Sequence, residues 1–168
     1  GIPGTEGSSA DRDPTRHVTI LSGNIGSPAT SGDNSYHVVV GSGTDGTAIL
    51  DGFTVTEGRA DGDGSFCDGG GMYNFKGSPR VIDCFFKDNY AAFFGGGLNN
   101  EESAPSVAGC TFADNTAGDS GGGMFGLSCT SELVNCTFSE NGAGSNGGGV
   151  TNYDGGLVLT NCTFSGNA

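Results

Sequence analysis

Basic residues are scarce in this sequence. Lys and Arg together number 6 against 19 Asp and Glu among 168 residues, which gives a formal net charge of -13. A surface of this sign repels phosphate backbones and anionic lipid headgroups. Long apolar runs are also missing, and none approaches the roughly 18 residues needed to cross a bilayer. We therefore expect no nucleic-acid partner and no membrane insertion of this segment.

Other absences narrow the structural class. The opening residues, GIPGTEGSSADRDP, contain neither a charged n-region nor an apolar core, so any export signal has been removed or lies outside this sequence. The 34 glycines follow no Gly-X-Y period, and 34% of residues are hydrophobic, which argues against both collagen and disorder. No segment has the pattern of a linker or a helix. We expect one domain with glycines at repeated turns.

A 26-residue interval organises the second half of the chain. It carries three columns of identical residues, Cys84, Cys110, Cys136 and Cys162, then Phe86, Phe112, Phe138 and Phe164, then Asn89, Asn115, Asn141 and Asn167. Triple glycines follow the same interval. Cys-x-Phe puts two apolar side chains on one strand face, and 26 residues suit three short strands and three corners. The sequence predicts an all-β right-handed parallel β-helix, a solenoid of about five to six coils.

The repeat changes along the chain. We expect an irregular entry segment and first coils in residues 1–52 and regular repeats in residues 53–168, as one continuous domain. The segment Phe53-Thr-Val55 aligns with Cys84-Phe-Phe86, but the coil that follows it carries an insertion, DGDGSFCD. This insertion is expected to form a loop outside the repeat.

Each column has an expected structural role. The Phe and Cys columns should face the core, and the Asn column should form a ladder of side-chain amides, with Asn in the left-handed conformation at a corner. Cysteines one coil apart would strain a disulfide, which favours a stack of reduced, buried thiols. A bridge between Cys67 and Cys129 stays open because both lie outside the column.

Carboxylates form a further column on the solvent side. Its members are Glu57, Asp88, Asp114 and Glu140, and the insertion adds Asp61, Asp63 and Asp68. Like charges at coil spacing repel, so either water and salt screen them or a cation bridges them. Oxygen ligands suit Ca²⁺, although the sequence contains no EF-hand spacing and no RTX nonapeptide. Calcium is the one candidate ion at these residues, and no other cofactor is expected.

The repeats carry a recognisable pair of motifs. GGGM, GGGL, GGGM and GGGV alternate with FKDN, FADN, FSEN and FSGN. They resemble the GGxx and FxxN tetrads of chlamydial polymorphic outer membrane proteins and the related β-helix repeats of secreted bacterial proteins. The resemblance implies an extracellular or cell-surface β-helix of bacterial origin. It covers the passenger-like part only, because no autotransporter barrel is present in the sequence.

Three function classes compete on these observations. We expect a non-enzymatic structural protein or adhesin, and the alternatives are a polysaccharide-binding module and a calcium-dependent polysaccharide lyase. A lyase needs a base beside its carboxylates, and only Arg59 and Lys87 are basic on that face, so catalytic residues are not expected. Aromatic residues near the corners are candidates for contact with host or matrix glycans and proteins.

The C-terminal repeat suggests a second kind of partner. Residues 157–168 repeat the first half of a coil and stop before the glycine triplet. Open solenoid ends present unpaired backbone groups, which favour pairing with another edge. We therefore expect that copies of the chain could stack head to tail into filaments.

Overall fold

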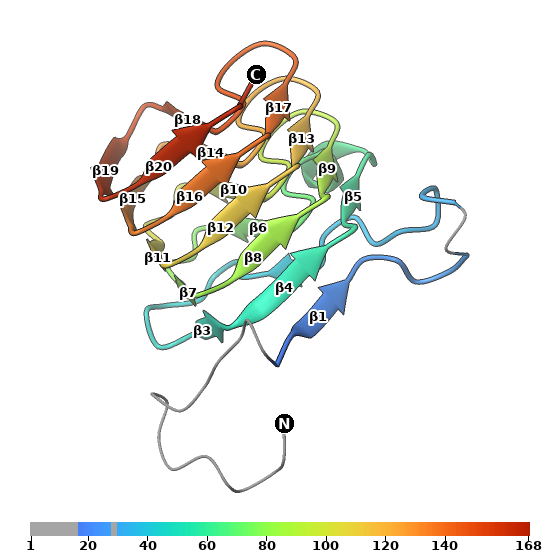
Figure 1. Cartoon of the computed structure of the whole chain (residues 1–168), viewed down its shortest axis with the longest axis horizontal. Coiled ribbons are helices and arrows are strands. Elements are labelled where there is room, and N and C mark those ends of the chain that lie inside the picture. The colour runs from blue at the N-terminus through green and yellow to red at the C-terminus, as the bar shows by residue number, and fades with distance from the viewer. Residues whose placement is uncertain (1–16, 28–29) are drawn as a thin grey trace, which may run out of the picture.

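The computed structural model describes residues 17–27 and 30–168, and its regular structure is almost entirely parallel β-strand. The chain winds as a right-handed solenoid whose coils stack from the N-terminal to the C-terminal part (Figure 1). Four parallel sheets run along the stack, and each takes one strand from successive coils. The all-β solenoid expected from the sequence is confirmed.

The sheets are named A to D. Sheet A contains β1 (Thr19–Ser22), β4 (Phe53–Thr56), β8 (Phe85–Lys87), β12 (Thr111–Ala113), β16 (Thr137–Ser139) and β20 (Thr163–Ser165). Sheet B contains β2 (Val39–Val40), β6 (Met72–Phe75), β10 (Leu98–Glu101), β14 (Met124–Leu127) and β18 (Val150–Tyr153). Sheet C contains β3 (Ile49–Asp51), β7 (Arg80–Ile82), β11 (Ser106–Ala108), β15 (Thr130–Val134) and β19 (Gly156–Thr160). Sheet D contains β5 (Arg59–Ala60), β9 (Tyr90–Ala91), β13 (Thr116–Ala117) and β17 (Gly142–Ala143).

A complete coil visits the sheets in the order A, D, B, C. The structure has about 4 coils of ~26 residues, slightly fewer than expected. Each complete coil has four strands and four corners instead of three. A residue with positive φ marks every corner, as in the coil with Asp83, Asp88, Gly95 and Glu102 at 47°, 55°, 64° and 48°. The additional strands, those of sheet D, are only two residues long, which is why the sequence pattern does not reveal them.

The left-handed residue at the A–D corner differs from the expected one. Asn89, Asn115 and Asn141 do not have positive φ; the acidic residue just before each of them does. The corner therefore turns at the acidic residue, and the Asn side chain that follows is buried. Asn is expected at such a corner because it tolerates the left-handed region, but Asp tolerates it as well.

The glycine triplets form the D–B corner. Gly95 has a φ of 64°, and a Cβ on Gly96 would lie only 2.4 Å from the carbonyl oxygen of Thr116 in the next coil. Backbone segments of successive coils therefore approach each other more closely here than any side chain permits. This close approach explains why the triplet recurs at the coil interval.

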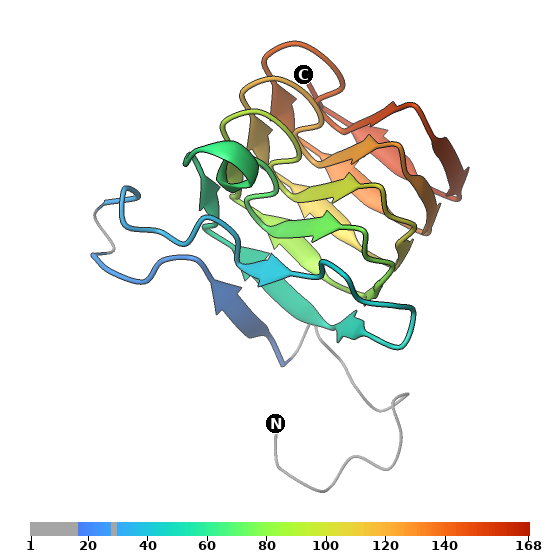
Figure 2. The ribbon, with the colours of Figure 1, turned by 180° about the vertical axis from the view of Figure 1, so that it is seen from behind.

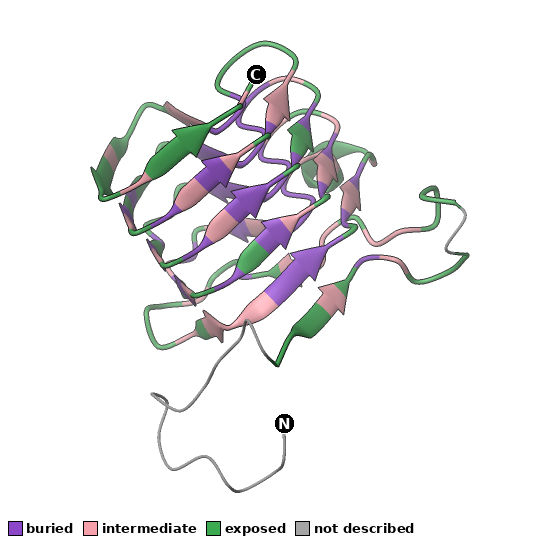
Figure 3. Ribbon diagram, viewed as in Figure 1, coloured by how far each residue is buried: buried purple, intermediate pink, exposed green. Residues whose placement is uncertain are grey.

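Burial concentrates in the middle coils. Phe86, Phe112 and Phe138 are completely buried, whereas β1 and β20, at the two edges of sheet A, are mostly exposed (Figure 3). The residues packed around the phenylalanines are Val55, Met72, Val81, Leu98, Val107, Met124, Leu133, Cys84, Cys110 and Cys136. One continuous core thus runs along the solenoid axis.

The insertion and the entry coil are the irregular parts. A short 3-10 helix, Gly64–Cys67, lies between β5 and β6 and stands in line with the loops that join sheets D and B in later coils (Figure 2). Among the described residues the entry coil contributes no strand to sheet D. The proposed division at residue 52 stays a prediction. Residues 1–16 of the entry segment lie outside the described part.

Candidate functional site

The acidic column lies along the A–D corner. Glu57, Asp88, Asp114 and Glu140 all have exposed side chains and φ values of 60°, 55°, 56° and 54°. Gly166 holds the same place after β20, with a φ of 62°. The backbone conformation is therefore what these positions share, and the carboxylates project into solvent from it.

The carboxylates of the column have different neighbours. Glu57 accepts a hydrogen bond of 2.5 Å from the Ser22 hydroxyl, and Asp88 forms an exposed ion pair with Lys87, with 3.4 Å between Nζ and Oδ2. Within the described chain, the side chains of Asp114 and Glu140 make no hydrogen bond or ion pair. The column is thus a row of separate surface charges, of which the first two are partnered.

The acidic residues of the insertion point to different partners. Asp61 accepts from Arg59 Nε at 2.7 Å, while Asp63 is exposed at the start of the 3-10 helix. Asp68 accepts the Phe94 N–H at 3.0 Å, and burial raises the pKa of its carboxyl to about 6. Across residues 17–27 and 30–168, no three His, Cys, Asp or Glu side chains are grouped so that they could hold a metal ion. Calcium binding stays untested.

A small cavity unites several of the residues singled out from the sequence. It has a volume of about 320 Å³ and lies at the first A–D corner, where Glu57, Arg59, Asp88 and Tyr90 meet the polar residues that follow position 29. Asn34 fastens this segment to the corner, because its Nδ2 donates to the Glu57 carbonyl at 2.8 Å. Lys87 does not line the cavity.

Arg59 is held at the cavity by two contacts. Its guanidinium lies over the Tyr90 ring, 4.8 Å from the centroid, and its Nε donates to Asp61. A guanidinium remains protonated in proteins and donates without accepting. Arg59 can therefore bind and orient a ligand here, but it is unsuited to the proton abstraction that a lyase requires.

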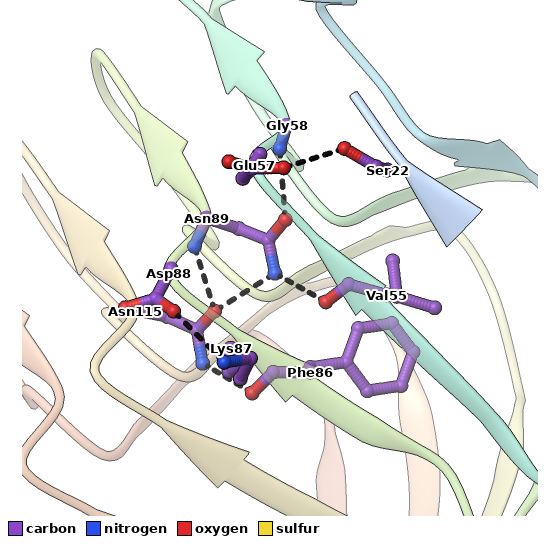
Figure 4. A network of polar contacts seen from close by, with 9 residues as sticks. All are labelled: Ser22, Val55, Glu57, Gly58, Phe86, Lys87, Asp88, Asn89 and Asn115. Atoms are coloured by element: carbon purple, nitrogen blue, oxygen red, sulfur yellow. Dashed lines mark hydrogen bonds and ion pairs between the residues drawn. The ribbon is translucent and has the colours of Figure 1, made fainter. Parts of the chain in front are cut away.

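The Asn column forms a buried ladder between coils. Asn89 Nδ2 donates to Val55 O and to Asn115 Oδ1, both at 3.0 Å, and its own Oδ1 accepts from the Gly58 N–H (Figure 4). Asn115 repeats the arrangement with Phe86 O and Asn141 Oδ1, at 2.9 and 3.0 Å. Each amide thus satisfies backbone groups of the preceding coil and donates to the asparagine side chain of the next coil.

The Phe column lies beside this ladder. Ring centroids of successive phenylalanines from Phe86 to Phe164 are 4.9, 4.7 and 4.9 Å apart, with interplanar angles of 6°, 2° and 5°. The rings therefore form one stack at the coil spacing.

All six cysteines are free thiols. In the column, each Sγ donates to the carbonyl two residues earlier, for example from Cys84 to Ile82 at 3.2 Å. Burial raises the pKa of the Cys136 thiol to about 11. Cys67 lies in the insertion and donates to Gly64 O, whereas Cys129 is buried at the B–C corner and donates to Asn152 Oδ1 at 3.1 Å. The two therefore belong to different corners.

A second interior column of side-chain amides was not predicted from the sequence. It runs through the strands of sheet B and consists of Asn74, Asn100 and Asn152, with Gly41 and Gly126 in the same register. Asn74 Nδ2 donates to Asn100 Oδ1 at 2.8 Å, but Asn74 Oδ1 and Asn100 Nδ2 are buried without partners. The glycines on either side explain both orphaned atoms. The 26-residue spacing of these asparagines was the available signal.

Comparison with other proteins assigns no family. No family model matches the chain, no curated protein matches it, and no solved structure matches it. No helix in the described ranges is long and apolar enough to span a bilayer.

Proposed function

We propose that this chain is a stiff, non-enzymatic segment of an extracellular β-solenoid protein, a stalk or adhesin that presents side chains along its outer corners. The observation that carries the proposal is the continuous interior. Phenylalanine rings stack at 4.7 to 4.9 Å and asparagine amides bond coil to coil, so that the repeated inward positions serve rigidity. The outward corner positions carry varied charged residues, as expected of a surface that makes contacts.

The tetrad motifs support a finer version of this proposal. The GGGM and FKDN series resembles the passenger repeats of chlamydial polymorphic outer membrane proteins, and such a passenger is displayed on a bacterial surface. The six thiols suit that environment in one respect: four of them are buried and so shielded from oxidants. Head-to-tail stacking of copies stays a prediction, which light scattering of the purified chain at high concentration tests.

A product assay tests the non-enzymatic part of this proposal, and hydrogen exchange tests its rigidity. The purified chain is incubated with polygalacturonate, alginate and neutral polysaccharides, and reducing ends and unsaturated uronates are measured over time. We expect no product above the blank. Product formation that disappears in Arg59→Gln would show that the chain is an enzyme acting at this cavity. In parallel, hydrogen exchange should show the slowest amides in β8, β12 and β16, as expected of a rigid central stack.

A further inference from the structure

The cavity at the first A–D corner is preformed. Two hydrogen bonds of 2.8 Å fasten Asn34 and Ser35 to the corner. Asn34 Nδ2 donates to the Glu57 carbonyl, and the Arg59 N–H donates to the Ser35 carbonyl. On its other side, the Gly23 N–H donates to Thr56 O at 2.8 Å. These bonds hold the described residues on both sides of positions 28–29 to the corner, which lowers the entropic cost of binding.

The walls of the cavity offer donors and acceptors close together. Carboxylates come from Glu57 and Asp88, the guanidinium from Arg59, and hydroxyls from Thr30 and Ser31. The one aromatic ring at the cavity is covered, since the Arg59 guanidinium lies over the Tyr90 face. A ligand with several hydroxyl groups matches such walls, because each hydroxyl both donates to a carboxylate and accepts from a guanidinium.

The charge and size of the cavity limit the classes of ligand that fit it. The lining contains two carboxylates and one guanidinium, and the chain as a whole carries a charge of -13, so uronates, sulfates and phosphates are repelled. A bare divalent cation would meet the guanidinium of Arg59 and only two carboxylates. The volume of about 320 Å³ is at the lower end of ligand sites and suits one ring-sized unit.

We propose that this cavity binds one neutral sugar residue of a glycan chain. This inference deepens the proposed function and rests on it, because it gives the outward face of the solenoid a ligand. Glu57 and Asp88 accept hydrogen bonds from the sugar hydroxyls, and the terminal nitrogens of Arg59 donate to them. The rest of the glycan extends into solvent from the open side of the cavity.

Titrations of the full chain test the sugar site. The probes are neutral oligosaccharides of mannose, galactose and glucose, oligogalacturonate, and Ca²⁺ alone, measured by calorimetry and by NMR shifts. We expect at least one neutral oligosaccharide to bind and the other two probes not to bind. Asp88→Gly should weaken that binding about tenfold or more, since a charged acceptor is lost while glycine suits the left-handed backbone.

The matched control is Asp114→Gly. It makes the same change in the same column one coil further on, outside the cavity, so its affinity for the sugar should equal that of the unchanged chain. Equal weakening in both variants, a preference for oligogalacturonate, binding of Ca²⁺ alone at Asp88, or no sugar binding by a folded chain would each overturn the sugar site. None of these results makes the chain an enzyme or its central stack flexible, so the proposed function fails on different results, which are turnover of polysaccharide or fast hydrogen exchange in β8, β12 and β16.

Discussion

At the scale of single residues, position in the coil decides what each side chain does. Phe86 and Phe85 are neighbours on β8, yet the first is completely buried and the second is 38% exposed. The alternation of a strand therefore separates core from surface, as the Cys-x-Phe pattern predicts. The acidic residues at the A–D corners are exposed for a different reason. Their left-handed backbone conformation points the side chains to solvent, and the strand alternation does not predict that conformation.

Truncation of one stacked ring tests the core. Phe112 lies between Phe86 and Phe138 with ring centroids 4.9 and 4.7 Å away. Phe112→Ala should lower the free energy of unfolding by about 3 to 5 kcal/mol, because it removes buried surface and leaves a cavity. Phe85→Ala, on the exposed face, should cost much less. Chemical denaturation compares the two, and equal losses would contradict the assigned register.

Asp68 gives the chain a specific pH dependence. Burial raises the pKa of this carboxyl in the folded state to about 6. The folded chain therefore holds the proton more tightly than the unfolded chain, and stability from this group is present below about pH 4 and lost as the pH rises through 6. Because Asp68 is only partly buried, we expect a loss of about 1 to 2 kcal/mol at neutral pH.

Asp68→Asn isolates this contribution. The amide oxygen can still accept the Phe94 N–H, and the side chain no longer ionises. The variant should be more stable than the unchanged chain at pH 7 and equal to it near pH 4. Burial lowers the pKa of His37, which acts in the opposite direction but is common to both proteins. A stability difference that does not vary with pH would refute the assignment.

At the scale of elements, the interior ladders tie one strand to the next coil. Parallel strands of two to five residues have few backbone hydrogen bonds each, and the amide columns add bonds at the corners where strands end. The 26-residue interval predicts the Phe and Asn columns. It does not predict sheet D, since Tyr90–Ala91 and its equivalents are too short for an alternation pattern to appear.

Replacement of one ladder amide tests this role. The side chain of Asn115 donates to Phe86 O and Asn141 Oδ1, and it accepts from the main chain and side chain of Asn89. Asn115→Leu should destabilise by about 2 to 4 kcal/mol, because several buried groups lose partners. Thr137→Leu on the outer face should change stability by less than about 0.5 kcal/mol. An unaltered melting temperature for Asn115→Leu would show that the ladder contributes little.

A double-mutant cycle tests the second asparagine column, that of sheet B. Gly126 interrupts the column, and a Cβ there would lie 2.4 Å from Cys129 Sγ and from Asn152 Oδ1. The coil before it combines Asn100 with Ser103, whose hydroxyl bonds to the Glu101 carbonyl at 2.8 Å. Gly126→Asn alone should destabilise because of the crowding, whereas Gly126→Asn with Cys129→Ser reproduces that earlier coil.

We expect a favourable coupling of about 1 to 2 kcal/mol in this cycle. The coupling comes from the smaller serine oxygen, which relieves the crowding between residue 126 and residue 129, so that the new asparagine can offer an acceptor to Asn100 Nδ2, which is buried without a partner. Thermal denaturation of the two single variants and the double variant measures the coupling. Simple additivity would mean that the serine does not relieve the crowding at position 126 and would contradict this account of the glycine.

At the scale of the whole molecule, repetition made the architecture predictable and irregularity hid the candidate site. Columns at a fixed interval report a solenoid directly. The cavity depends instead on contacts between residues far apart in sequence, such as Asn34 with the Glu57 carbonyl. The 26-residue interval does not predict these contacts. Sequence reasoning therefore named Glu57, Arg59 and Asp88, but it did not find the segment that encloses them.

The net charge makes the whole solenoid sensitive to salt. A charge of -13 includes a row of exposed carboxylates that stack at coil spacing along the A–D corner, where like charges repel across roughly 5 Å. Raising the ionic strength should therefore raise the melting temperature by weakening this repulsion. Among the described residues, these carboxylates do not gather in groups of three that suit a metal ion.

We accordingly expect Ca²⁺ and Mg²⁺ to raise the melting temperature equally at the same ionic strength, after removal of bound metal with a chelator. Screening depends on the charge of the ion, whereas a calcium site prefers the larger ion with its higher coordination number. Differential scanning fluorimetry in matched series of CaCl₂, MgCl₂ and KCl measures the shifts. A larger shift with Ca²⁺ that disappears in Asp88→Gly but persists in Asp114→Gly would instead place a calcium ion at the first two carboxylates of the column.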